Sequence, residues 1–175
     1  RTIAQTLHNI AIIQQTKGEY DEALENLRQS MEIERKLGDQ RGIAFTLHQI
    51  ALIHQDKGEY DKALEKYKQS MVINTKLGDQ QIIATTLHQI ALIHQNKGEY
   101  DEALEKYRQS MVIERKLGDQ RGIAYTFAQI GLFYFQIGKK EEAIESTQKA
   151  LEIFEKIGLE NEARKAKDQI KKMSL

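Results

Sequence analysis

The sequence predicts an all-α fold, an α-solenoid of four helical hairpins with a capping helix at the C-terminal end. Three observations support this prediction. The 175 residues contain no proline, so nothing interrupts long helices. The string KGEYD recurs at residues 17–21, 57–61 and 97–101, a spacing of 40 residues. Within each repeat the apolar residues follow the 3.6-residue period of a helix rather than the alternation of a strand.

The repeats are predicted at residues 1–40, 41–80, 81–120 and 121–160, and the capping helix lies in residues 161–175. The second and third repeats are identical at 32 of 40 positions, whereas the fourth keeps 14 of 40 against the second. Near-identical neighbours imply near-identical surroundings, which a linear stack of modules provides.

In the second repeat, Gly58 and Gly78 end two predicted helices, an inner helix at residues 40–56 and an outer helix at residues 60–77. Asp39, Asp79 and Asp119 are predicted helix N-caps. The inner helices lack charge over residues 2–15, 42–55, 82–95 and 122–135, whereas the outer helices carry many acids and bases. We therefore expect shielded inner helices and outer helices whose charges are solvated.

The predicted packing side of the inner helix consists of Ile43, Leu47, Ile50, Ala51 and Ile53, and that of the outer helix of Ala63, Leu64, Tyr67, Met71 and Ile73.

The two ends of the array differ. Residues 161–173 predict a one-sided helix with apolar groups only along Ala163, Ala166, Ile170 and Met173, as suits a solenoid cap. At the other end Ile3, Leu7 and Ile10 begin a full-strength repeat without such a cap. We expect either that further repeats precede Arg1 in a parent chain or that this end associates with another molecule.

Composition disfavours several functions. Lys and Arg (26) balance Asp and Glu (26), so no overall basic field attracts nucleic acid. The chain has no cysteine and no apolar run near the roughly 18 residues of a membrane span, which favours a cytoplasmic protein that does not enter membranes. No phosphate loop, HExxH motif or cysteine nucleophile is present. We expect no enzyme activity and no cofactor.

The positions of small and aromatic residues resemble the tetratricopeptide repeat (TPR) family, particularly its 40-residue variety in spindle-orientation adaptors and in bacterial and archaeal signalling arrays. The residues that carry the resemblance are Ala51, Gly58, Tyr60, Ala63, Tyr67 and Ser70, then Phe127, Gly131, Tyr134, Ala143 and Ala150 in the fourth repeat. The resemblance implies a right-handed superhelix whose inner helices line a concave groove for an extended peptide or a partner helix. The family's clamp for a C-terminal carboxylate is not expected, because the uncharged stretches hold no Lys or Arg.

A second stripe on each inner helix remains once the packing side is removed, spaced i, i+3, i+4, i+7, i+10 and i+11 on one face. It predicts a groove lined by amides and leucines with an aromatic end. The candidate peptide-binding residues are Phe45, His48, Gln49, Leu52, Gln55, Thr85, His88, Gln89, Leu92, Gln95, Asn96, Tyr125, Gln129, Leu132 and Phe135, and the first repeat has Gln5, His8, Asn9, Ile12, Gln15 and Thr16 at equivalent places.

His8, His48 and His88 occupy equivalent places in successive repeats. Neighbouring helix axes lie about 8–10 Å apart, too far for one zinc ion to reach more than two of these histidines. A pH-sensitive contact stays open, and ordinary hydrogen-bonded histidines are the favoured interpretation.

The favoured function is a protein–protein interaction scaffold. Two alternatives remain: a structural spacer or a rod that self-assembles end to end through its uncapped N-terminal repeat, and a regulatory repeat segment of a larger signalling protein.

Overall fold

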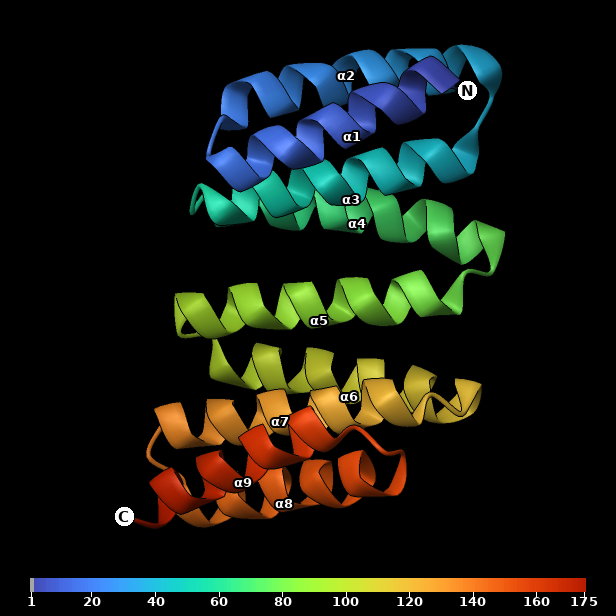
Figure 1. Ribbon diagram of the computed structural model, residues 1–175. Coiled ribbons are helices and arrows are strands. Elements are labelled where there is room, and N and C mark those ends of the chain that lie inside the picture. Colours follow the sequence, from blue (N-terminus) through green and yellow to red (C-terminus); the bar gives the residue numbers. More distant parts are fainter. Residues whose placement is uncertain (1) are drawn as a thin grey trace. The chain divides into compact units, whose positions relative to one another are not determined.

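The computed structural model describes residues 2–175, and this part of the chain folds into nine α-helices without a strand (Figure 1). Their bounds are α1 Thr2–Lys17, α2 Tyr20–Leu37, α3 Gln40–Asp56, α4 Tyr60–Leu77, α5 Gln80–Lys97, α6 Tyr100–Leu117, α7 Gln120–Gln136, α8 Lys140–Lys156 and α9 Glu160–Ser174. The predicted all-α class is confirmed, and the helices predicted at residues 40–56 and 60–77 are α3 and α4.

The chain divides into two compact units, Arg1–Thr86 and Leu87–Leu175. Unit 1 holds α1 to α4 and the first turns of α5, and unit 2 holds the rest of α5 with α6 to α9. Within each unit, short turns join consecutive helices into antiparallel hairpins.

Local sequence explains where the helices begin and end. Asp39 and Asp119 each accept a hydrogen bond on Oδ1 from the backbone N–H three residues on, at 3.0 and 2.8 Å, and Asp79 does so at 3.3 Å. The predicted N-caps are therefore confirmed. At the C-terminal end of α2, Gly38 has φ +66°, a left-handed conformation that is strained for residues with a Cβ.

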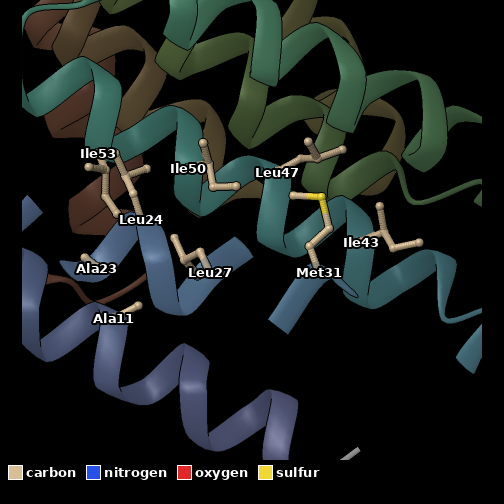
Figure 2. Packing of buried hydrophobic residues seen from close by; sticks show 9 residues of the cluster. All are labelled: Ala11, Ala23, Leu24, Leu27, Met31, Ile43, Leu47, Ile50 and Ile53. Atoms are coloured by element: carbon tan, nitrogen blue, oxygen red, sulfur yellow. The ribbon is translucent and has the colours of Figure 1, made fainter. Parts of the chain in front are cut away.

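The core of unit 1 lies between its inner and outer helices. In Figure 2, side chains of α2 and α3 point toward one another, with Ala11 of α1 beneath them. The predicted packing side of α3 is buried throughout, and so are Ala63, Leu64 and Tyr67 of α4. Met71 and Ile73 of α4 are half-buried, and Ile73 packs against the core cluster as predicted.

In unit 2, α9 covers the last hairpin. Ala163 and Ala166 of α9 join a core cluster with Ala124, Ala150 and Phe154. Met173 is also buried and Ile170 is half-buried, so the apolar stripe predicted for the capping helix faces the fold.

Candidate ligand-binding cavity of unit 1

Unit 1 contains a cavity of about 750 Å³ on the face formed by α1, α3 and the start of α5. Polar amides, apolar side chains and charged groups all contribute to its wall. The lining residues are Ala4, Gln5, His8, Asn9, Ile12, Glu34, Leu37, Asp39, Arg41, Gly42, Phe45, His48, Gln49, Asn74, Asp79, Ile82 and Thr85. Its volume lies within the range of pockets that bind small molecules or a few side chains.

Four of the predicted groove residues line this cavity, namely Phe45, His48, Gln49 and Thr85. Four equivalent residues of α1 accompany them: Gln5, His8, Asn9 and Ile12. Leu52 and Gln55 lie further along α3 and do not line the cavity; both are half-buried. Gln55 accepts a hydrogen bond from the Tyr67 hydroxyl at 3.0 Å, so part of its polar capacity serves the hairpin itself.

In unit 2 several predicted groove residues also take part in packing. Gln95 accepts from the Tyr107 hydroxyl at 3.2 Å, Leu92 packs on a core cluster, and Tyr125 packs edge-on against Phe154. His88, Gln89 and Gln129 are half-buried, whereas Asn96, Leu132 and Phe135 are exposed.

The three equivalent histidines are hydrogen-bonded, but to different partners. His8 Nδ1 lies 3.2 Å from Ser30 Oγ, whereas His48 Nδ1 lies 3.2 Å from Thr86 Oγ1. His88 Nε2 lies 2.6 Å from Thr126 Oγ1. Burial lowers the pKa of His8 and His48, and it lowers the pKa of His88 to about 4. All three are neutral near pH 7.

Glu34, an acid of outer helix α2, is part of the cavity wall and was not among the predicted site residues. We expected the charges of the outer helices to be solvated, and for Glu34 this was wrong, because its residue is only 5 % exposed. Thr46 Oγ1 donates to its Oε2 at 2.7 Å and Ser30 Oγ donates to its Oε1 at 3.2 Å. Burial raises the pKa of this carboxyl above its ordinary value.

The third repeat has the same arrangement, and here too the expectation of a solvated acid was wrong. Glu114 is buried and accepts hydrogen bonds from Ser110 and Thr126. A Cβ added at Gly122 would lie 3.1 Å from Glu114 Cγ, and one added at Gly42 would lie 2.9 Å from Glu34 Cγ. These glycines leave room for the acids.

A signal for the buried acids was present in the repeats. The first and third repeats pair Glu with a following glycine (Glu34 with Gly42, Glu114 with Gly122), whereas the second pairs Asn74 with Ile82. Residues that change together between repeats indicate a shared contact.

The uncharged stretches of the inner helices predicted a groove without charged groups. The cavity wall does contain charged groups. Besides Glu34, its wall includes Asp39, Arg41 and Asp79. Asp39 and Asp79 precede inner helices and Arg41 lies in the first turn of one. The uncharged stretches begin only after these three residues. The face of the inner helix alone therefore does not reveal them.

Within residues 2–175 no group of three or more histidine, aspartate or glutamate side chains is arranged to hold a metal ion. None of the helices described is both long enough and apolar enough to cross a membrane.

The fold defines a helical-repeat protein, and unit 1 has a cavity on its inner helix face. A family model described as tetratricopeptide repeat matches residues 2–76 and again residues 82–156. The chain therefore belongs to the tetratricopeptide repeat family, whose members are generally protein-interaction modules and typically lack enzyme activity. No curated protein sequence matches the chain.

Solved structures of low sequence identity share the fold. BtubC from P. vanneervenii is 16 % identical with a TM-score of 0.76, over 97 % of this chain and 79 % of that one. Aspartyl phosphate phosphatase F from Bacillus subtilis is 15 % identical with a TM-score of 0.82, and the match covers 89 % of this chain and 41 % of that one. A signal transduction ATPase with numerous domains from Pyrococcus horikoshii, which has a tetratricopeptide repeat sensor, is 19 % identical with a TM-score of 0.82, over 93 % and 25 %.

Proposed function

We propose that this chain is a protein-interaction module that holds a segment of a partner protein in the unit 1 cavity, and that the candidate residues of unit 2 form a further contact surface. The mechanism is equilibrium binding to a preformed site, which requires little ordering of the host. We also propose that the chain acts in the cytoplasm, as expected from its sequence.

The observation that carries the proposal is the exposed apolar surface inside the cavity. Phe45 is 47 % exposed and Ile12 is 40 % exposed, although both are large hydrophobic residues. The amides of Gln5, Asn9 and Gln49 lie in the same wall. Apolar anchors beside amides suit a peptide, because the amides can pair with its backbone while the apolar groups receive its side chains.

Phe45→Thr tests this assignment. The third repeat has Thr85 at the equivalent position, so the fold accepts threonine there. For a peptide selected by display against the full chain, we expect calorimetry to show an affinity loss of roughly tenfold or more, because an aromatic anchor is removed.

The matched control is Val72→Thr, at an exposed position of outer helix α4. It should leave the affinity of the selected peptide unchanged. Equal affinities of wild type and Phe45→Thr for that peptide would show that the cavity is not the peptide site.

A specific observation also favours self-association as a second candidate. Ile3, Ile10 and Ile13 on one side of α1 are 67 %, 40 % and 55 % exposed. Their equivalents in α3, Ile43, Ile50 and Ile53, are 9 %, 5 % and 1 % exposed, because the preceding outer helix α2 packs against them. We propose that a second copy of the chain covers this side of α1. The alternative of a regulatory segment in a larger protein is compatible with either candidate.

A further inference from the structure

We propose that the unit 1 cavity receives an arginine side chain from the bound partner segment, with Glu34 as its counter-ion and His8 as a hydrogen-bond acceptor. This inference rests on the proposed function, since the arginine belongs to the segment that the module holds.

The carboxylate of Glu34 forms part of the cavity wall. It is buried in the cavity wall, and its hydrogen-bond donors, Ser30 and Thr46, are neutral. Among residues 2–175 no Lys or Arg lies within ion-pair distance of it, and the nearest basic atom is His8 Nδ1 at 3.8 Å. A buried carboxylate without a cation is costly, so a cationic ligand group would gain more here than at the protein surface.

The hydrogen bond to Ser30 fixes which nitrogen of His8 carries the ring proton. The Ser30 hydroxyl has acceptors at the Ala4 carbonyl (3.1 Å) and at Glu34 Oε1 (3.2 Å), and its single hydrogen is used there. Ser30 Oγ therefore accepts from His8, which places the ring proton on Nδ1. Nε2 is then an acceptor. His8 is 5 % exposed and lines the cavity, and its buried Nε2 has no hydrogen-bond partner among the residues described.

Within the described part of the chain, the cavity wall carries the carboxylates of Glu34, Asp39 and Asp79 and the guanidinium of Arg41. Asn74 points its amide nitrogen toward Ser70 O and Oγ, so its oxygen is the amide atom outside these two bonds. The wall is thus rich in acceptors, and a ligand group with several N–H donors and a positive charge complements it.

The aromatic wall favours arginine over lysine. Phe45 stacks on the His8 ring with centroids 4.7 Å apart and planes tilted by 34°, and much of its surface remains exposed. A planar guanidinium can lie against an aromatic face while its edge donates to a carboxylate and to a ring nitrogen. An ammonium group is a compact point charge and gains less from this combination.

Unit 2 offers a matched comparison. Glu114 is buried with the same serine and threonine partners as Glu34, but it is not part of the unit 1 cavity. His88, its neighbour at 3.9 Å, is hydrogen-bonded through Nε2 to Thr126, whereas His8 has no partner at Nε2. Glu114→Gln therefore repeats the substitution Glu34→Gln in similar surroundings away from the proposed site.

The test is an NMR titration of the full chain with N-acetyl-arginine methylamide. We expect saturable shifts of the His8 ring and of the Phe45, Gln49 and Thr85 backbone amides, with a dissociation constant on the order of 1–10 mM for so small a probe. The citrulline analogue, which has nearly the same shape but no charge, and the lysine analogue should both bind more weakly. Glu34→Gln should weaken arginine binding by roughly tenfold, and Glu114→Gln should leave it unchanged.

Three results would overturn the inference: no saturable shifts at the cavity, citrulline binding as tightly as arginine, or equal losses in Glu34→Gln and Glu114→Gln. If Glu34→Gln does not fold, Glu34→Asn replaces it, because the second repeat has Asn74 at that position. Peptides that need Phe45 but show no preference for arginine would leave the proposed function standing and refute this inference. Arginine binding at the cavity, with no peptide that binds there, would support an arginine site but contradict the proposed function.

Discussion

At the scale of single residues, burial shifts the pKa values of two glutamates and three histidines. Glu34 and Glu114 have raised pKa values and His8, His48 and His88 have lowered ones, and desolvation is the largest cause in each case. Both kinds of shift favour the neutral form. As the pH falls, the glutamate shifts stabilise the folded chain and the histidine shifts destabilise it. Substituting one residue at a time therefore separates the two effects.

His88→Gln tests the histidine shift. The pKa of His88 is about 4 in the folded chain against 6.5 ordinarily, so its stabilising effect is complete above pH 6.5 and is lost as the pH falls toward 4. Glutamine keeps an N–H donor for Thr126 but does not titrate. Between pH 7.5 and 5, wild type should lose about 2 kcal/mol more free energy of unfolding than the variant in denaturant titrations. An equal or opposite slope would mean that the ion pair with Glu114 outweighs burial.

Glu34→Gln has the opposite pH dependence. Because the folded pKa of Glu34 is raised, its contribution to stability is complete below the ordinary glutamate pKa and is lost as the pH rises through the folded value. Lowering the pH from 7 to 4 should therefore stabilise wild type relative to the variant. Denaturant midpoints of both proteins at each pH measure this difference. A constant difference across the range would show that Glu34 is not desolvated.

At the scale of helices, the sequence was sufficient for much of the fold. The glycine spacing, the aspartate caps and the helical apolar period predicted α3 and α4 at their observed bounds, because these signals are local. Burial of Glu34 could not be predicted from its own helix, since it depends on Thr46 and Gly42 of the next one. The helical pattern alone assigns every outer-helix acid to solvent.

Gly131→Ala tests how closely helices α7 and α8 approach. A Cβ at residue 131 would clash with Thr147 Oγ1 and would lie 3.1 Å from the Ala143 carbonyl oxygen. Overpacking should cost about 1–3 kcal/mol of unfolding free energy, measured by denaturant titration. In a double-mutant cycle, Thr147→Ala should recover part of that loss. Strictly additive effects of the two substitutions would contradict this contact.

At the scale of the molecule, the wall of the unit 1 cavity contains both residues predicted to line a groove and residues predicted to cap helices. Predicted groove residues such as Gln49 lie beside cap and turn residues such as Asp79. The stripe on α3 was predictable from its period. The extent of the cavity was not, because it depends on how α1, the end of α2 and the start of α5 meet α3.

The exposed side of α1 gives a prediction about assembly. If a second copy covers this side, sedimentation should show a mass that rises with concentration, because three apolar side chains leave water on association. Ile3→Gln with Ile10→Gln and Ile13→Gln should abolish the rise, whereas Val72→Gln with Val112→Gln, at exposed positions of α4 and α6, should not. A strict monomer at high concentration would contradict self-association.

The most direct test of the account is to map by NMR where a display-selected peptide binds on the full chain. Binding in the cavity predicts that perturbed amides cluster at Phe45, His48, Gln49 and Thr85, with α1 residues around Asn9. Perturbations confined to the outer helices α2, α4, α6 and α8, with the cavity residues unchanged, would contradict it.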